Sequence, residues 1–589
     1  MKIGIEIHQQ LATKKLFCNC PSILREDDPD GSIVRRLRAV SGESGVVDRA
    51  AEHEMLRGQA FKYEFYNNTT CLVEMDEEPP HDMNEEALYV TLQMARLLRM
   101  KVLDRIQVMR KIVIDGSNTS GFQRTALVAR DGLLDTSEGT IRIDGLYLEE
   151  DAAKIVSRTE DTTTYRLDRL GIPLIEIGTA PDITSPQQAK EAALKLGMLL
   201  RSTGKAKRGI GTIRQDLNLS VPGGNRVEIK GAQELKMIPV WLENEARRQE
   251  RLIALWSRIK KSRLMDPADI TTIFSKTQSK LMKGAISKGN KVIAFCCKGC
   301  KGLFGEELLK DYRFGTELSG LAKAKAGIGG IIHSDELPAY GITPEEITSV
   351  SKHLNCSQDD AFVIILSSAE KAAKAFNALK ERLTQTVPNE VRRANPDGTS
   401  TFLRPMPGAA RMYPETDIPL VIPQTKGIEL PEMLEDKSVR YEKQYGLSKE
   451  LASLAVKEEI PLDELTKTYR KIESKVIVDL LVNAPREIKR RFSLEVDAKA
   501  HLNDIFPLLN RGELTREGAF ELLLAYAKGE KPRIEDFMRL KDDQLAKEIG
   551  RIVQENKGLP FNALVGKAMQ KLRGRAEGKK IVEALRKRV

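Results

Sequence analysis

Two side chains near the start of the chain, Glu6 and His8, are of types that can do chemistry. They lie in the alternating run I-G-I-E-I-H-Q-Q at residues 3–10. On a strand, side chains two residues apart share a face, so the isoleucines would point one way and Glu6 and His8 the other. A carboxylate beside an imidazole suits a cation site or half of an active centre, and equally the solvated face of an ordinary strand.

Four further polar clusters follow in strand-like runs before residue 262. They are Glu149, Glu150 and Asp151 in Y-L-E-E-D-A-A-K, Asp168 and Glu176 in L-D-R-L-G-I-P-L-I-E-I, Arg214 and Asp216 in I-R-Q-D-L-N, and Glu228 and Lys230 in R-V-E-I-K. Glu176 interrupts an apolar run, and a carboxylate is rarely buried unless it is paired or bound to metal. Singly, each cluster fits a surface acid. Together they indicate a hard-cation site suited to Mg²⁺ carrying nucleotide phosphates.

A glycine-flanked polar segment, D-G-S-N-T-S-G-F-Q-R-T-A-L at residues 115–127, is a candidate nucleotide contact. Its backbone N–H groups could hold a phosphate or a ribose. It has no G-K-[ST] and is therefore not a Walker A loop, so alone it is a weak signal.

The seven cysteines predict neither a disulfide framework nor a zinc site. An odd number in a large chain without secretory features is typical of a reducing cytoplasm. Cys18, Cys20 and Cys71 provide three thiolates where structural zinc takes four ligands, and the group Cys296, Cys297 and Cys300 also lacks a second pair.

The elements that must position these residues belong to a multidomain α+β chain of 589 residues. Residues 1–262 contain many strand-like runs and two helical stretches, 84–99 and 185–202, which predict a unit with a large sheet. Residues 268–394 form a second α+β module, and a Pro/Gly-rich segment follows. Beyond residue 429 the chain reads as amphipathic helices. No apolar run is long enough to cross a membrane.

The C-terminal end carries a local excess of positive charge. Residues 561–589 contain nine Lys or Arg against two Glu, a local charge of +7 within a chain of net charge +10. This density fits contacts with nucleic-acid phosphates, and the alternative is a solvated helical tail.

Several of these motifs occur in an order that resembles one family. They are G-I-E-I-H followed by L-F-C-N-C-P, G-F-Q, E-E-D-A-A-K, R-L-G-I-P-L-I-E-I-G-T-A-P-D-I, I-R-Q-D-L-N, E-I-K and Y-P-E-T-D-I-P. The chain resembles the B/E subunit family of tRNA-dependent amidotransferases over essentially its whole length. An insertion with R-F-G-T-E-L-S-G-L-A-K and I-I-H-S-D-E-L resembles the insertion domain of bacterial-type aspartyl-tRNA synthetases, and it separates the archaeal E branch of the family from the bacterial B branch.

The resemblance implies a fold class and a division of the chain. The fold is α+β and multidomain: a kinase-type catalytic domain with a large mixed or antiparallel sheet (residues 1–267 and 395–428), an inserted α+β domain like that of aspartyl-tRNA synthetase (268–394), an all-α helical domain (429–504) and a basic helical tRNA-binding tail (505–589). The implied activity uses ATP and Mg²⁺ to phosphorylate the glutamate side chain of Glu-tRNA(Gln), which ammonia then converts to Gln-tRNA(Gln).

Site residues are carried over position by position. The resemblance implies that His8, Glu149 and Glu176 are metal ligands, that Glu6, Glu150 and Asp216 support them, and that Gly121, Gln123, Arg214 and Lys230 contact the nucleotide. The choice between Glu149 and Glu150 stays open. Two departures matter: the C-x-x-C pair of bacterial relatives is missing near Cys71, so their zinc is not carried over, and the segment 209–216 lacks an acid that they have.

The chain lacks the signatures of an amidase or an asparaginase, which indicates that it does not make its own ammonia. The resemblance implies an asparaginase-like D subunit as the ammonia source. The cysteine usage predicts a cytoplasmic location, and the lack of a long apolar run predicts no membrane partner. Two other classes remain open: a non-catalytic tRNA-binding adaptor related to aspartyl-tRNA synthetase, and a synthetase that charges free aspartate or glutamate.

Overall fold

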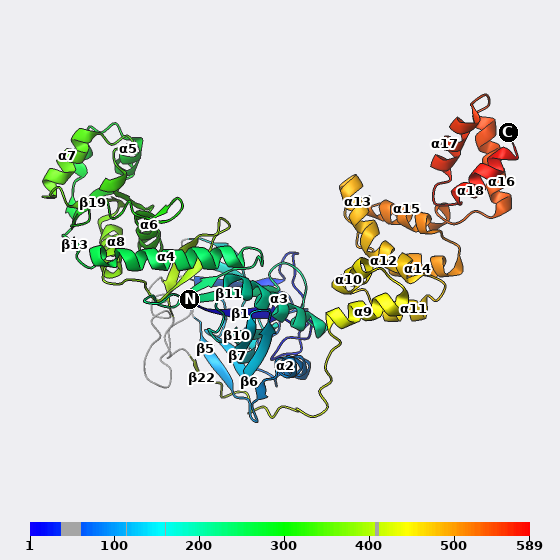
Figure 1. Ribbon diagram of the computed structural model, residues 1–589, viewed down its shortest axis with the longest axis horizontal. Coiled ribbons are helices and arrows are strands. Elements are labelled where there is room, and N and C mark those ends of the chain that lie inside the picture. Colours follow the sequence, from blue (N-terminus) through cyan, green and yellow to red (C-terminus); the bar gives the residue numbers. More distant parts are fainter. Residues whose placement is uncertain (37–59, 114, 160, 407–411, 589) are drawn as a thin grey trace. The chain divides into compact units, whose positions relative to one another are not determined.

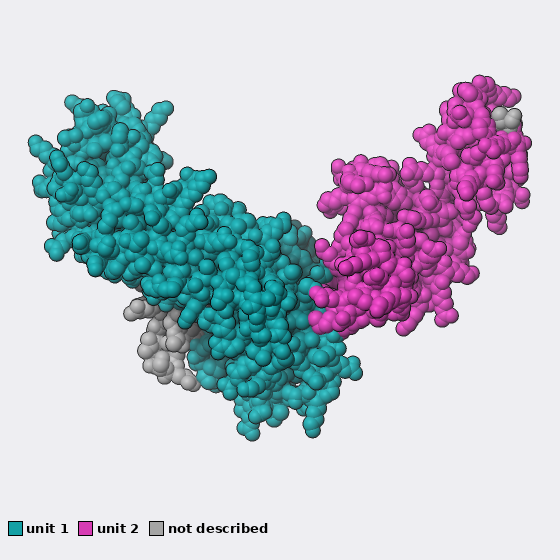
Figure 2. Space-filling model, viewed as in Figure 1, with its two compact units in different colours: residues 1–431 teal, residues 432–589 magenta. Residues whose placement is uncertain are grey.

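The computed structural model describes residues 1–36, 60–113, 115–159, 161–406 and 412–588 (Figure 1). The chain divides into two compact units, Met1–Pro431 and Glu432–Val589, which are coloured separately in Figure 2. Strands and helices alternate in the first unit, whereas the second is helical. The prediction of a chain that mixes helices and strands around a large mixed sheet is therefore confirmed, while the division into four α+β and all-α domains stays a prediction.

The first unit is organised around one eleven-stranded sheet. In spatial order its strands are β21 (Ser400–Pro405), β20 (Glu390–Ala394), β12 (Val227–Lys230), β11 (Ile213–Ser220), β1 (Lys2–Gln10), β10 (Pro173–Thr179), β7 (Gly139–Glu150), β6 (Phe122–Thr136), β5 (Val108–Ile112) and β22 (Met412–Pro414), with β4 (Lys101–Val102) beside β6. Neighbours pair antiparallel except β12 and β20, which are parallel. Strand β1 thus lies between two strands that come far later in the sequence.

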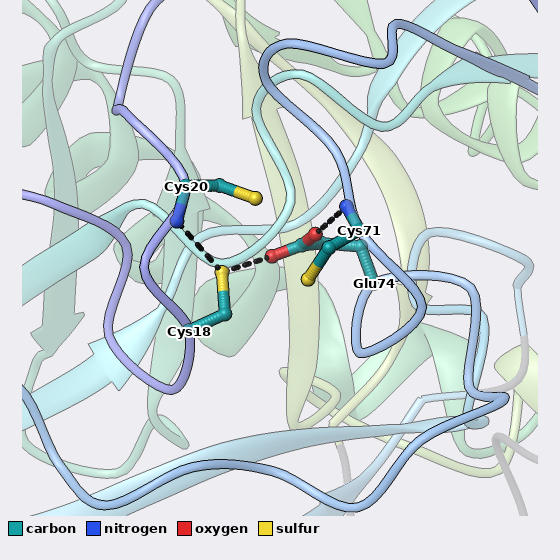
Figure 3. Close-up of side chains that lie close together, drawn as sticks. All are labelled: Cys18, Cys20, Cys71 and Glu74. Atoms are coloured by element: carbon teal, nitrogen blue, oxygen red, sulfur yellow. Dashed lines mark hydrogen bonds between the residues drawn. The ribbon is translucent and has the colours of Figure 1, made fainter.

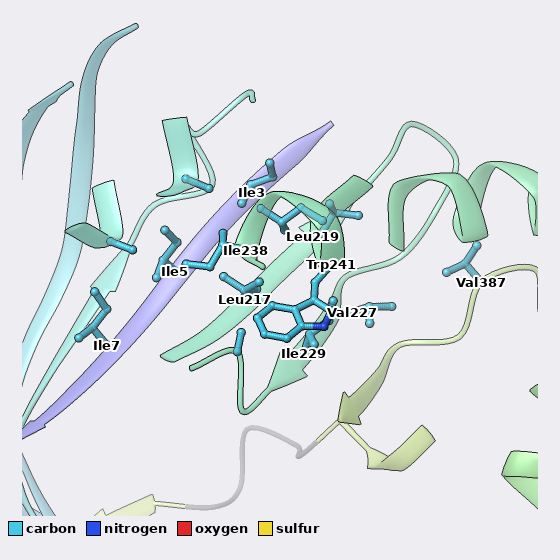
Figure 4. Close-up of a cluster of buried hydrophobic side chains, with 14 of the residues drawn as sticks. Ile3, Ile5, Ile7, Leu217, Leu219, Val227, Ile229, Ile238, Trp241 and Val387 are labelled. Atoms are coloured by element: carbon cyan, nitrogen blue, oxygen red, sulfur yellow. The ribbon is translucent and has the colours of Figure 1, made fainter. Parts of the chain in front are cut away.

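One face of this sheet forms the core. Ile3, Ile5 and Ile7 of β1 are fully buried, as the alternation predicts, and Figure 4 shows them beside Leu217 and Leu219 of β11. Three helices pack on this face: α2 (Glu85–Leu97) on β6 and β7, α3 (Pro186–Ser202) on β1 and β6, and α4 (Ile238–Ile259) on β11. Because the apolar face is covered, the polar positions of the same strands face away from the core.

The two helices expected from the sequence are present and begin at side-chain caps. The Asn84 side chain accepts a hydrogen bond from the backbone N–H of Ala87 at the start of α2, and Ser185 accepts one from Gln188 at the start of α3. Such caps satisfy backbone donors that have no partner inside the helix.

The remaining elements of the first unit form three smaller sheets with their helices. A four-stranded sheet has the order β2 (Gly31–Arg35), β3 (Ala60–Phe65), β9 (Thr162–Arg166) and β8 (Lys154–Arg158). A five-stranded sheet contains β13 (Arg263–Leu264), β15 (Lys291–Lys298), β19 (Ala361–Ser367) and β18 (Ile331–His333), with β14 (Ala268–Asp269) beside β15. Strands β16 (Glu307–Leu309) and β17 (Tyr312–Arg313) pair, and the helices are α5 (Lys280–Ser287), α6 (Phe314–Ala326), α7 (Pro344–His353) and α8 (Ala369–Arg382).

A buried ionic cluster joins α4 to the elements that follow it. The guanidinium of Arg248 donates to Glu245 of α4 at 2.8 Å and to both carboxylate oxygens of Glu317 of α6 at 2.9 Å. Arg382 of α8 also donates to Glu317, at 3.2 Å, and Arg392 of β20 pairs with Glu390 at 2.5 Å. All these side chains are buried. Three guanidinium groups thus share three carboxylates, and this balance lets the charges remain inside.

The second unit contains two hydrophobic clusters. Its helices are α9 (Leu434–Tyr445), α10 (Lys449–Lys457), α11 (Leu462–Thr468), α12 (Ser474–Val478), α13 (Ala484–Phe492), α14 (Leu502–Arg511), α15 (Arg516–Ala527), α16 (Asp542–Glu555), α17 (Phe561–Lys571) and α18 (Gly578–Arg586). One cluster of buried residues runs from Tyr441 to Leu524, and a separate one runs from Leu545 to Leu585. Among the described residues, no helix is both long and apolar enough to cross a membrane.

Candidate active site

The polar face of the large sheet gathers the residues expected to be functional. Across adjacent strands, His8 of β1 lies opposite Glu176 of β10 and Arg214 of β11, and Glu6 lies opposite Asp216. Glu228 of β12 lies opposite Asn218 of β11, which is two residues after Asp216 and therefore on the same face. Antiparallel partners on one face lie about 4.5–5.5 Å apart, so the register brings acids from distant segments into contact.

A first cluster consists of His8, Glu149 and Glu176, whose ligand atoms lie within 4.8 Å of one another. His8 Nε2 is 3.3 Å from Glu176 Oε2 and 4.0 Å from Glu149 Oε1. Burial alone would lower the pKa of His8, but the carboxylates of Glu176 and Glu149 outweigh it, so the pKa is raised. One imidazole and two carboxylates of this kind could hold a divalent cation.

Lys111 of β5 belongs to this cluster and was missed from the sequence. Its Nζ is 3.1 Å from Glu149 Oε2 and 3.7 Å from Glu176 Oε2, and the hydroxyl of Thr125 donates to Glu149 at 2.9 Å. Burial would raise the pKa of Glu176, yet Lys111 and His8 lower it below its ordinary value. The sequence feature that could have indicated Lys111 is its position as a charged residue within the strand-like run V-M-R-K-I at residues 108–112.

A second cluster lies beside the first and consists of Glu6, Asp216 and Glu228, again within 4.8 Å. Lys230 Nζ is 2.6 Å from Asp216 and 2.5 Å from Glu228, and the amide of Asn218 donates to Glu6 at 3.0 Å. Burial raises the pKa of Glu6, and so do Glu176 and Glu228. Burial lowers the pKa of Lys230, but Asp216 and Glu228 more than offset this and raise it. The two clusters together form a continuous acidic surface with embedded cations.

Arg214 is held at the end of this surface. Its guanidinium donates to Asp151 Oδ1 at 2.8 Å, and the amide of Gln10 donates to Asp151 Oδ2 at 2.5 Å. Asp151 is buried, so one carboxylate fixes both side chains. Such a held guanidinium could orient an anionic group of a substrate.

Glu150 is not brought to either cluster. It alternates with Glu149, so it points to the other side of β7, where its carboxylate lies 3.3 Å from Arg124. Arg124 also pairs with Glu415 of the Y-P-E-T-D-I-P segment, at 2.8 Å. Gln123, the second residue of β6, donates to the backbone carbonyl of Glu150 at 2.6 Å, and Gly121, just before β6, adopts a positive φ of 78° in a turn. The geometry therefore favours Glu149 over Glu150 as a ligand.

A third group of donors corrects an expectation from the sequence. Cys18, Cys20, Cys71 and Glu74 offer ligand atoms within 4.8 Å of one another (Figure 3). The thiol of Cys18 donates to Glu74 at 2.8 Å, and hydrogen bonds from Cys18 and Cys20 lower the pKa of Cys71. The expectation that the three cysteines lack a fourth ligand is wrong, because it considered thiolates only. The spacing C-x-x-E from Cys71 to Glu74 was the available signal, and three thiolates with a carboxylate could hold zinc.

Two cysteines of the second α+β module, unlike those of the Cys18 group, are bonded to each other. Cys297 and Cys300 are joined in a disulfide, so neither is available as a thiolate ligand. The expectation of reduced cysteines holds for the other five, which are free.

The polar face of the sheet carries two carboxylate clusters with one histidine and two lysines among them. Sites of this kind bind divalent cations and phosphate groups. A family model described as the GatB/GatE catalytic domain matches residues 1–429. The chain belongs to this family, whose members are amidotransferases of the ligase type.

Several curated relatives match over their full lengths. Proteins named as the E subunit of glutamyl-tRNA(Gln) amidotransferase are 45% identical in Methanocaldococcus jannaschii, 43% in Sulfolobus acidocaldarius and 42% in Haloarcula marismortui. Each alignment covers 100% of this chain and 97–98% of the relative. Residues 268–394 and the helical C-terminal unit are therefore aligned with these archaeal proteins as well as the catalytic region.

Proposed function

We propose that this chain uses ATP to phosphorylate the side-chain carboxylate of glutamate esterified to tRNA(Gln) and then amidates it, giving Gln-tRNA(Gln). The observation that carries the proposal is the polar sheet face, where His8, Glu149 and Glu176 meet beside the cluster of Glu6, Asp216 and Glu228. Full-length similarity to proteins named for this tRNA and this reaction supports the substrate.

The chemistry needs two steps at one place. A carboxylate is a poor acceptor for ammonia, so the terminal phosphoryl group of ATP is first transferred to the γ-carboxylate oxygen, which gives an acyl phosphate and ADP. Ammonia then attacks the acyl carbon, phosphate leaves and a proton is released. Both steps build negative charge on phosphoryl oxygens, which fixed cations and a divalent metal can stabilise.

The residues present fit Mg²⁺. His8, Glu149 and Glu176 would hold it, with Glu6 and Asp216 next to them, and carboxylate oxygens are the donors that this hard cation prefers. When bound there, Mg²⁺ would neutralise part of the triphosphate charge.

The chain's own side chains have separate roles in this proposal. Lys111 and Thr125 fix the orientation of the Glu149 carboxylate, at 3.1 Å and 2.9 Å. Lys230 and Arg214 are cations at the other end of the site, each held by buried carboxylates, where they would orient phosphate oxygens. Gly121 lies on the turn before β6 and Gln123 is the second residue of β6, and both would contact the nucleotide.

The proposal extends to partners. An asparaginase-like D subunit of the amidotransferase would supply ammonia, and the aspartyl-tRNA-synthetase-like residues 268–394 and the basic tail would contact the tRNA in the cytoplasm. The charge of +7 within residues 561–589 supports the tail contact.

The test is conversion of [¹⁴C]Glu-tRNA(Gln) by the purified chain with ATP, Mg²⁺ and an ammonium salt, without any partner. We expect labelled glutamine after deacylation, dependent on both ATP and ammonium. Glu149→Gln should abolish it, while Glu530→Gln, which alters an exposed acid in the second unit, should not.

That assay and a pyrophosphate-exchange assay together separate the rival classes. A chain that binds Glu-tRNA(Gln) and forms no ADP or glutamine would be the non-catalytic adaptor. A chain that exchanges pyrophosphate with ATP on free aspartate or glutamate would be a synthetase. Either result contradicts the proposal.

A further inference from the structure

A short turn beside the site displays an apolar side chain to solvent. Residues 208–211, R-G-I-G, connect the end of the α3 region to β11, and Ile210 is not covered by any part of the chain that the structure describes. Gly209 and Gly211 have φ angles of +118° and +82°, conformations that glycine adopts readily and other residues rarely do. Ile210 therefore stands at the tip of a turn whose shape depends on its two flanking glycines.

The turn is firmly held at its base. The backbone carbonyl of Gln10 accepts from Lys207 N–H at 2.8 Å, and the N–H of Gln10 donates to the carbonyl of Thr212 at 2.9 Å. The side-chain amide of Gln9, which is buried, donates to the carbonyls of Lys207 and Thr212 at 3.0 and 3.2 Å. Four hydrogen bonds thus fix the backbone at the base of the turn, and this backbone holds Ile210 in its exposed position.

The base of the turn is continuous with the proposed active site. Gln9 and Gln10 directly follow His8 on β1, and Arg214, four residues after Ile210, lies opposite His8. The side chain of Gln10 also reaches Asp151, which holds Arg214. The tip therefore stands at the rim of the acidic surface.

The arm that leads to the tip is basic. Three basic residues occur in the four residues 205–208, K-A-K-R, where Lys205 pairs with Glu86 of α2 at 2.6 Å, whereas the site itself is rich in carboxylates. The Nζ of Lys207 donates to the carbonyl of Ser22, and the adjacent Ile23 and Leu24 are exposed apolar residues. Surfaces that bind single-stranded nucleic acid combine cations that face the phosphates with side chains, usually aromatic, on which the bases pack, and here exposed aliphatic side chains occupy that position.

We propose that the turn 208–211 is the contact for the 3′-terminal nucleotides of the aminoacyl-tRNA, with Ile210 packed on a base and the basic arm facing the adjoining phosphates. This inference rests on the proposed function. Because the reacting carboxylate is joined to the terminal ribose through the glutamyl residue alone, the terminal adenosine must lie at the rim of the site during the reaction. Ile210 is a fully exposed apolar side chain at this rim that could pack on the adenine.

The first experiment compares Ile210→Ser with Leu194→Ser, a matched change of an exposed apolar residue on α3. Two substrates are used, full-length Glu-tRNA(Gln) and the glutamyl ester of the trinucleotide CCA, each with ATP and ammonium. We expect Ile210→Ser to raise KM for the CCA ester about tenfold with kcat within about twofold, because lost apolar contact weakens binding. KM for ATP should not change, and Leu194→Ser should match the unaltered chain.

The second experiment places the photoreactive residue p-benzoylphenylalanine at position 210 of the full chain, with tRNA(Gln) and the ammonia-supplying partner protein both present. We expect cross-links within the 3′-terminal nucleotides. Cross-links to the partner protein, or to the tRNA body alone, would overturn the inference, and so would an Ile210→Ser variant that behaves like Leu194→Ser.

The two proposals fail separately. If the unaltered chain makes no glutamine from Glu-tRNA(Gln), the proposed function fails, while the cross-linking still decides whether the turn contacts the tRNA end. If the unaltered chain is active and the tip yields neither the change in KM nor the cross-link, only this inference fails.

Discussion

His8 of β1 and Glu176 of β10 lie directly opposite each other, with Nε2 of the imidazole 3.3 Å from Oε2 of the carboxylate. Lys111 reaches the same oxygen at 3.7 Å. Together these neighbours lower the pKa of Glu176 although burial acts to raise it. Glu176 is therefore a charged carboxylate in a mostly buried position, which is what a cation site requires.

Replacing Glu176 by Gln should remove this charge while keeping the side-chain volume. We expect amidation of Glu-tRNA(Gln) to fall at least about 100-fold, and the Mg²⁺ concentration for half-maximal activity to rise in any residual activity. Activity is measured over a Mg²⁺ titration and the fold by circular dichroism. Unchanged Mg²⁺ dependence with near-normal turnover would remove Glu176 from the site.

The group of Cys18, Cys20, Cys71 and Glu74 predicts metal content. We expect the purified chain to contain about one zinc per molecule, measured by atomic emission, because three thiolates and a carboxylate supply the four ligands that structural zinc takes. Cys71→Ser should lose the metal and Glu74→Cys should retain it. Zinc-free protein, or full zinc in Cys71→Ser, would contradict this assignment.

The buried ionic cluster predicts a large loss of stability on Glu317→Gln. Arg248, Arg382 and Arg392 would remain buried with one carboxylate fewer, which should cost about 3 kcal/mol or more. Both tryptophans of the chain, Trp241 and Trp256, lie on α4, the helix that carries Arg248 and Glu245, so their fluorescence reports the unfolding of this part of the chain. Glu381→Gln, which alters an exposed acid paired with Lys325, should change stability by less than about 1 kcal/mol.

The same carboxylate predicts a pH dependence. Burial raises the pKa of Glu317, but Arg248, Arg392 and Arg382 outweigh it and lower the pKa to about 2, from an ordinary value of 4.5. The stabilisation is fully present above pH 4.5 and is lost as pH falls toward about 2, where the folded state also takes up the proton. Acid unfolding followed by tryptophan fluorescence should be less steep in this window for Glu317→Gln. Identical slopes in the two proteins would contradict the pairing.

The sequence predicted what local patterns determine. Alternation placed Ile3, Ile5 and Ile7 in the core and Glu6 and His8 on the other face, and the predicted helical stretches 84–99 and 185–202 correspond to α2 and α3. Such signals depend on residues near one another in the chain.

The arrangement of the strands could not be predicted from those patterns. Strand β1 pairs with β10 and β11, and Lys111 arrives from β5, four places away from β1 in the sheet. Period-two alternation says which face a residue occupies but not which strand lies beside it. Glu74 was missed for a different reason, since its carboxylate completes a set in which only thiolates were sought.

The hydrophobic clusters of the second unit decide where a truncation should be made. A cut at residue 505 would divide the cluster that runs from Tyr441 to Leu524, whereas the cluster from Leu545 to Leu585 begins after it. Removal of residues 540–589 takes away the segment of charge +7 and leaves the larger cluster whole. We therefore expect KM for Glu-tRNA(Gln) to rise about tenfold or more, with a smaller change in kcat.

The truncated chain offers an internal control, because the CCA ester of glutamate has no tRNA body for the tail to contact. Its KM should be the same for the full and truncated chains. The rise for full-length tRNA should shrink as salt increases from about 50 to 200 mM, since the lost contacts are with phosphates. A KM for tRNA that does not change on truncation at low salt would show that residues 540–589 do not bind it.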